Sequence, residues 1–176
     1  MLTPRLILTA LAASVLVAPA AYAQAPTAAP AAAPAVPEVM PFDIPSGTPV
    51  SMDTAQKAIM AAVTEAKKHN WKMSITVVDP AGNLVAHATM DGTQYASVPI
   101  SQGKARTAAL YRRPSKAFED AVNTGGRPSV LSLMGMTGAA ASEGGFPIVI
   151  DGKLIGAIGA SGGISVLTSS VVIGES

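Results

Sequence analysis

Two β-hairpin signals constrain the fold of this chain more than any other feature of its sequence. The first is a β-rich segment, residues 73–78, joined to a second at 84–90 by Asp-Pro-Ala-Gly at 79–82. Proline and glycine stand second and fourth in that tetrapeptide, the positions that a type I turn favours for them. The second signal spans residues 146–160 around the tight-turn dipeptide Asp-Gly at 151–152. The pattern predicts a mostly antiparallel sheet.

Helical patterns lie before and between the two hairpins. In residues 52–70, apolar side chains recur at helical spacing, and Asp53 with Gln56 has the arrangement of a capping box at the start. Three shorter helical segments follow the first hairpin, at 98–111, 115–122 and around 130–134. The order helix, hairpin, helices, hairpin predicts an α+β domain, in contrast to the regular alternation that builds a parallel sheet.

The first residues have the pattern of a secretory signal peptide. Arg5 supplies a positive charge, residues 6–18 form an uncharged apolar run, and Ala-Tyr-Ala at 21–23 is a small-x-small cleavage site. The apolar run is shorter than the ~20 residues of a membrane-spanning helix. We therefore expect residues 1–23 to be removed, no stable membrane span after cleavage, and export to the periplasm or out of the cell.

A proline- and alanine-rich segment follows at residues 24–50. It holds seven of the 14 prolines, separated mostly by alanine and other small residues. Such a composition buries little apolar surface and favours an extended backbone. We expect a disordered linker over 24–50 and a single folded domain over 51–176, a length that supports one modest core.

Charge and cysteine content exclude several classes of function. The chain has 12 basic residues, one of them Arg5, and 11 acidic residues, so the mature chain is near neutral. A general nucleic-acid binder would carry a basic excess. The chain has no cysteine, which excludes thiolate zinc sites, iron–sulfur clusters and covalently attached c-type heme. Two histidines are too few for a histidine-rich metal site.

The residues that could carry chemistry leave binding and structural interpretations open. His69 has the position of a helix cap, and His87 lies mid-strand, where a structural or solvent-facing role is favoured. The glycines between 156 and 163 lack the spacing of a nucleotide-binding loop. The acidic residues are scattered, so neither a carboxylate pair nor a nucleophile–base triad is expected. Five cations cluster where two predicted helices meet, and they could bind anions or form a solvated face: Lys104, Arg106, Arg112, Arg113 and Lys116.

Six segments, taken in order, resemble the GlcG/HbpS-like family of heme-binding proteins, which is related to the C-terminal domain of PduO-type adenosyltransferases. The most distinctive are Val-Val-Asp-Pro-Ala-Gly-Asn-Leu-Val at 77–85 and Gln-Gly-Lys-Ala-Arg-Thr-Ala at 102–108. The full set is 55–62, 74–85, 90–92, 102–108, 114–115 and 144–163. Each segment is weak alone, but six in sequence are specific.

The resemblance implies a profilin- or PAS-like layer fold, with about five mostly antiparallel strands and helices packed on the sheet, and a homo-oligomer. It also implies heme as the cofactor. Thr107 stands at the family threonine linked to heme, with Lys104 and Arg106 placed to pair with propionates and Arg113 at the same basic junction.

Other candidates follow less directly from the resemblance. Met90 and Tyr95 are looser candidates for contact with heme. Because some relatives are reported to use an N-terminal histidine, His69 is a second candidate metal ligand beside Thr107.

One departure affects the end of the domain. The family usually continues past its last Gly-Gly into an acidic, alanine-rich helix, whereas residues 164–173 are rich in Val, Ile, Ser and Thr, which are indifferent helix formers. The resemblance implies an exported heme-binding protein in extracytoplasmic heme sensing or handling. The alternatives are a module that binds a small anion or corrinoid without heme, and a weak heme-degrading enzyme. The enzyme ranks last, because no positioned acid–base pair is visible.

Overall fold

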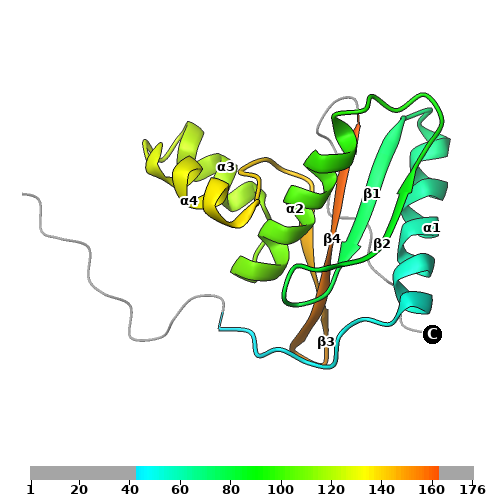
Figure 1. Cartoon of the computed structure of the whole chain (residues 1–176), viewed down its shortest axis with the longest axis horizontal. Helices are drawn as coiled ribbons and strands as arrows, with labels where there is room; N and C mark the ends of the chain where they lie inside the picture. The colour runs from blue at the N-terminus through cyan, green and yellow to red at the C-terminus, as the bar shows by residue number, and fades with distance from the viewer. Residues whose placement is uncertain (1–42, 163–176) are drawn as a thin grey trace, which may run out of the picture. The chain divides into compact units, whose positions relative to one another are not determined.

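A computed structural model describes residues 43–162, which form an α+β domain with one antiparallel sheet (Figure 1). The expected fold class is confirmed, with four strands described where about five were expected. The predicted signal peptide, most of the predicted linker and the segment 164–173 lie outside the described residues. The elements in chain order are α1 (Met52–Lys68), β1 (Met73–Val78), β2 (Leu84–Thr89), α2 (Ser97–Tyr111), α3 (Lys116–Asn123), α4 (Ser129–Thr137), β3 (Gly145–Ile150) and β4 (Lys153–Gly162).

Both predicted hairpins form, and they join through their inner strands into one sheet with the order β2-β1-β4-β3. All three pairings are antiparallel. In the register of the sheet, Thr76 of β1 lies opposite His87 on β2 and Gly159 on β4. The strands β2 and β3 therefore form the two edges of the described sheet.

Ser51 is the N-cap of helix α1, and its hydroxyl accepts a hydrogen bond from the backbone N–H of Thr54 at 3.2 Å. The sequence predicted Asp53 as the cap, and that prediction is wrong by two residues. Ser51 has an extended backbone that holds its side chain over the first free N–H groups. Asp53 lies within the first turn instead and pairs with Lys57 at 2.8 Å.

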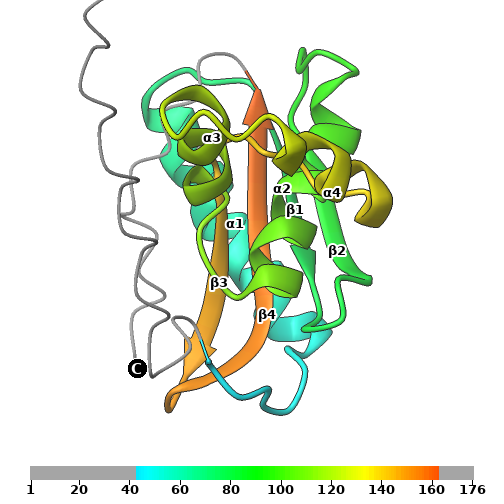
Figure 2. The same ribbon diagram turned by 90° about the vertical axis from the view of Figure 1, so that its left-hand side faces the viewer.

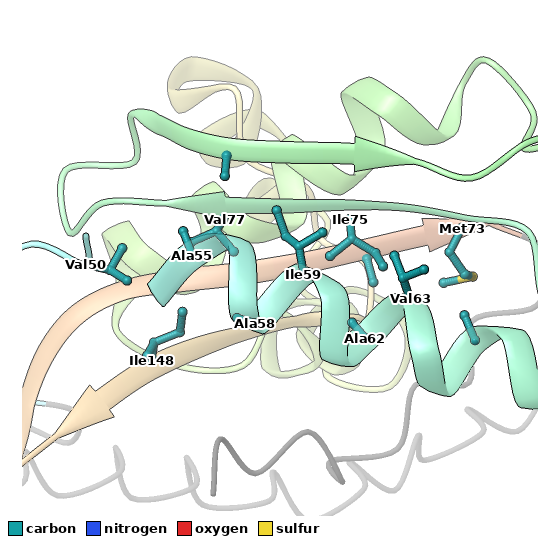
Figure 3. Packing of buried hydrophobic residues seen from close by; sticks show 13 residues of the cluster. Val50, Ala55, Ala58, Ile59, Ala62, Val63, Met73, Ile75, Val77 and Ile148 are labelled. Atoms are coloured by element: carbon teal, nitrogen blue, oxygen red, sulfur yellow. The ribbon is translucent and has the colours of Figure 1, made fainter. Parts of the chain in front are cut away.

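The main core lies between α1 and one face of the sheet (Figure 3). The buried stripe of α1 recurs at helical spacing, as its sequence predicts. It packs on Met73, Ile75 and Val77 of β1 and on Ile148 of β3. The α1 residues in this core are Ala55, Ala58, Ile59, Ala62, Val63 and Ala66.

Helix α2 covers the opposite face of the sheet, where it packs against β1, β3 and β4 (Figure 2). Small residues allow a close approach, since a Cβ placed on Gly159 of β4 would overlap the carbonyl oxygen of Ser101. The second buried cluster lies at this interface and consists of Val78, Ala105, Ala108, Ala109 and Ala157.

A register shift in β2 decides which of its side chains share a face. Val77 pairs with Ala86 and Val78 pairs with Leu84, which leaves Val85 as an extra residue on β2. Val85 packs against the α1 core together with Ala86. Strict alternation along β2 would put Val85 on the same face as His87, but the extra residue turns it to the opposite face.

Residues 44–50, which the sequence assigned to the linker, run along β4. The backbone N–H groups of Gly47 and Val50 donate to the carbonyl oxygens of Leu154 and Ile155, each at 2.7 Å. Val50 is buried in the main core. The folded part therefore begins before Ser51, because these residues satisfy backbone groups of β4.

The short helices α3 and α4 pack on each other and stand beside the sheet (Figure 1). Phe118 of α3 is buried, with its ring centroid 4.8 Å from that of Tyr111. Helix α4 leaves Leu131, Leu133 and Met136 largely exposed. None of the helices among the described residues has the length and apolar character needed to cross a membrane.

Candidate functional site

The segment 138–144, between α4 and β3, covers the side of α2 that carries Thr107. Thr107 is fully buried. Its hydroxyl lies 2.8 Å from the carbonyl oxygen of Gly103 and 2.9 Å from that of Ala140, to which it can donate. The same hydroxyl accepts a hydrogen bond from the backbone N–H of Ala140 at 2.8 Å. Backbone groups therefore occupy the hydroxyl that the family resemblance links to heme.

Two further side chains fasten the same segment. The buried hydroxyl of Ser115 donates to the carbonyl oxygen of Ser142 at 2.6 Å and accepts from the N–H of Gly145 at 2.8 Å. The carboxylate of Glu119 accepts from the N–H of Glu143 at 2.6 Å. The role of Ser115 and Glu119 in holding this segment is not visible in the local sequence, since their partners lie 24 to 30 residues away, although Ser115 belongs to the family-like pair at 114–115.

Lys104 lies beneath this segment with only 3% of its surface exposed, and its side chain approaches Gly144. Burial lowers the pKa of its ammonium group, while the negative charges of Glu119 and Glu143 act in the opposite direction. Among residues 43–162, no hydrogen bond or ion pair joins the Lys104 amine to a partner. The expectation of scattered acidic residues is corrected here, because the fold brings these two carboxylates near one buried lysine.

Arg106 links two distant parts of the chain. Its Nε donates to the carbonyl oxygen of Gly82, in the turn between β1 and β2, at 3.2 Å. Its guanidinium group also lies against Gly138, at the C-terminal end of α4. Arg106 is half-buried, so part of its charge remains accessible at the edge of α2.

The remaining cations of the predicted cluster point to separate partners. Arg112 donates to the carbonyl oxygen of Ile44 at 2.8 Å, and its guanidinium lies 3.8 Å from the carboxylate of Asp43. Arg113 lies over the ring of Phe118, 5.0 Å from the centroid. Lys116 pairs with Asp120 at 2.6 Å. The five cations that cluster in sequence therefore do not form one patch.

The other candidates from the sequence lie apart from Thr107. His69 is the C-cap of α1, as predicted; its Nε2 lies 3.2 Å from a carboxylate oxygen of Glu65 and its ring stacks on Trp71. Met90 is partly buried against the α1 core, and Tyr95 is almost fully exposed. Across residues 43–162, no cluster of three or more His, Asp or Glu side chains could hold a metal ion.

His87 lies on the α2 side of the sheet, where hydroxyl groups bind both of its ring nitrogens. Nδ1 lies 2.8 Å from Thr76 Oγ1, and Nε2 lies 2.8 Å from Thr89 Oγ1. Thr76 is fully buried, His87 is half-buried and Thr89 is exposed. Burial lowers the pKa of His87, which favours the neutral imidazole. The sequence indicated only a structural or solvent-facing histidine, because the bond to the buried Thr76 depends on the pairing of β1 with β2.

The arrangement has two chemically distinct parts. Between α2 and the segment 138–144 lie the buried amine of Lys104 and the hydroxyl of Thr107, with the carboxylates of Glu119 on α3 and Glu143 nearby. The face of β2 beside α2 contains an imidazole with one side buried and the other near solvent.

The sequence of this chain matches a known protein family and known relatives. Residues 50–172 match the family described as "Haem degrading protein HbpS-like". The protein GlcG of Escherichia coli K12 is 44% identical over 112 residues, which cover 64% of this chain and 81% of GlcG.

Solved structures share the fold. A double mutant of HbpS from Streptomyces reticuli superposes with a TM-score of 0.61 at 28% identity, over 77% of this chain and 88% of that chain. A PduOC–heme complex gives a TM-score of 0.61 at 24% identity, over 67% of this chain and 86% of that chain, which supports the fold alone.

Proposed function

The chain belongs to the HbpS-like family, and we propose that it is an exported protein that binds heme and acts in sensing or handling heme outside the cytoplasm. The family match carries this proposal, because it spans the whole described sheet and the helix α2. The family description names heme as the molecule on which its members act.

The donor groups of this chain fit heme in part. An imidazole is among the common protein ligands of heme iron, and His87 presents one at a half-buried position. Arg106 offers a partly accessible guanidinium that can bind a propionate. Thr107 and Lys104 fit less well as they stand, since backbone groups occupy the hydroxyl and the amine is buried beside two carboxylates. Bound heme would supply an iron centre, and the residues of this chain would set the polarity around it.

Titration of the purified mature protein with hemin tests this proposal. We expect a saturable shift of the Soret band at a fixed stoichiometry, in contrast to the spectrum of free hemin. A thermal-shift screen with organic acids and corrinoids belongs in the same series. Stabilisation by one of these ligands, with a free-hemin spectrum throughout, would favour the alternative of a small-anion or corrinoid module.

Export and assembly are further parts of the proposal. Export is supported by the charged start, apolar run and small-x-small motif of residues 1–23, and it predicts a mature chain that begins at Gln24 in the periplasm or the medium. A homo-oligomer is supported by the exposed apolar side chains of α4, since Leu131, Leu133 and Met136 gain from burial. Mass spectrometry of the exported fraction and light scattering of the hemin-loaded sample test these two points.

A second candidate function is heme degradation, which the family description favours. The test is the stability of the Soret band at equal concentrations of protein and hemin. A steady Soret band argues for binding alone. Loss of the band with formation of an open-chain product, in aerated buffer with a reductant supplied and faster than for hemin alone, would argue for an enzyme.

A further inference from the structure

A continuous chain of hydrogen bonds runs from the first turn of α2 to His87. The hydroxyl of Ser101 donates to the carbonyl oxygen of Val98 at 2.9 Å. Ser101 Oγ lies 2.8 Å from Thr76 Oγ1, and Thr76 Oγ1 lies 2.8 Å from His87 Nδ1. Ser101 and Thr76 are both fully buried, so these bonds form away from bulk water.

The carbonyl oxygen of Val98, where this series of hydrogen bonds ends, sets the donor and the acceptor of every bond in the series. Because a carbonyl oxygen can only accept a hydrogen bond, the hydroxyl of Ser101 donates its one hydrogen to Val98. Ser101 must therefore accept from Thr76, and Thr76 must accept from His87 Nδ1. The consequence is an imidazole with its proton on Nδ1, which leaves Nε2 with a lone pair.

The outer side of His87 presents that lone pair near solvent. Nε2 accepts from the hydroxyl of Thr89, an exposed residue at the end of β2. The partner of Thr89 is the buried Ser74, at 3.0 Å. An incoming ligand therefore has to displace one exposed hydroxyl to reach Nε2, while the Nδ1 side stays anchored in the core.

The strand that carries His87 is an edge strand of the described sheet. Among residues 43–162, β2 packs mainly against α1 on the opposite face, whereas α2 packs mainly on β1, β3 and β4 (Figure 2). Leu84, which pairs with Val78 on the α2 side of the sheet, is more than half exposed. The exposed side chains of Leu84 and Thr89 therefore flank the half-buried His87 on β2.

We propose that Nε2 of His87 is the protein ligand of the heme iron, with Thr76 and Ser101 as the residues that orient it. This inference rests on the proposed heme function. Metal-bound histidines almost always donate their second ring N–H to a fixed acceptor, which sets the tautomer. His87 has that acceptor, whereas His69 points Nε2 at a carboxylate and stacks on Trp71 in an exposed setting.

Spectroscopy of hemin-loaded variants tests this assignment. The wild type, His87→Ala and the matched control His69→Ala are titrated with hemin and examined by absorption and electron paramagnetic resonance. We expect His87→Ala to change the spin state and to weaken hemin binding by about tenfold or more, the scale of a disturbed metal site. Free imidazole should restore the wild-type spectrum in His87→Ala, and His69→Ala should match the wild type.

Each outcome discriminates. If His87→Ala binds hemin with the wild-type spectrum and affinity, the assignment of His87 is overturned while the heme function stands. If the wild type itself leaves hemin with its free spectrum, both proposals fail. A change in His69→Ala alone would transfer the ligand role to His69.

A second measurement uses the protein without heme. Nitrogen-15 NMR of the histidine rings should show His87 protonated on Nδ1 and unprotonated on Nε2 at neutral pH. Thr76→Val removes the acceptor of the Nδ1 proton at nearly constant volume, and it should weaken hemin binding by roughly 10- to 100-fold. A His87 ring protonated on Nε2 in the wild type would overturn the proposed orientation.

Discussion

The hydroxyl of Thr107 lies 2.8 Å from the backbone nitrogen of Ala140, a residue 33 positions later in the chain. This bond attaches the segment 138–144 to α2. Ser115 and Glu119 attach the same segment through Ser142 and Glu143. The segment is held largely by side chains, so single substitutions can release it.

Thr107→Val should destabilise the fold. The substitution keeps the shape of the side chain but leaves the N–H of Ala140 without its partner, and a buried unsatisfied group costs about 1–3 kcal/mol. Thr107→Ser retains the hydroxyl and serves as the control. Urea denaturation at neutral pH measures the difference. Equal midpoints for Thr107→Val and the wild type would show that the bond contributes nothing.

Because Lys104 is buried, we expect the free energy of unfolding to increase at alkaline pH. Its folded pKa is lowered by burial, so between that pKa and the unfolded value of about 10.4 the unfolded chain binds the extra proton. Stability should therefore rise with pH across this window. Lys104→Met should lack that rise while remaining folded. Denaturation midpoints collected from pH 7 to 10.5 test the slope, and parallel curves for the two proteins would contradict it.

Because of the hydrogen bonds to Asp79, we expect the free energy of unfolding to decrease in acid. Burial alone raises its pKa, but hydrogen bonds from Asn83, Ala81 and Gly82 outweigh that effect and lower it. A lowered carboxyl pKa contributes stability above the unfolded value of about 3.9, and the contribution disappears as the pH falls through the folded pKa.

Asp79→Ala isolates this contribution. The variant should be less stable than the wild type at pH 7, and the gap should close below about pH 4. Thermal unfolding across pH 3–7 measures it. A gap that stays constant with pH would attribute the effect of Asp79 to the turn backbone alone.

Gly159→Ala should push α2 away from β4 and destabilise the fold. A Cβ at this position overlaps the backbone of Ser101 and Ala105, so the helix has to shift, which costs about 1–3 kcal/mol for an overpacked core. Gly135→Ala is the matched control, because a Cβ there meets nothing within 4 Å and alanine favours the helix α4. Chemical denaturation should show opposite signs for the two variants.

The role of the α2 motif in binding heme stays a prediction, while the structure shows what surrounds its residues. Lys104, Arg106 and Thr107 do lie together on α2 beside 138–144. Their polar groups are engaged or buried by that segment, which sequence proximity does not indicate. The five clustered cations likewise separate, because α2 ends at Tyr111 and the chain turns at the left-handed Arg112 before α3 begins at Lys116.

The sequence by itself determined the local elements of this protein. The turn tetrapeptide at 79–82, the Asp-Gly at 151–152 and the apolar stripe of α1 act within a few residues, so they specify hairpins and helix with little outside help. Only the tertiary structure decided the partners of Thr107, Glu119 and His87. The partners of Thr107 and Glu119 depend on how the segment 138–144 packs against α2 and α3. The buried partner of His87, Thr76, depends on the register between β1 and β2, because a slip by one residue would turn His87 to the other face of the sheet.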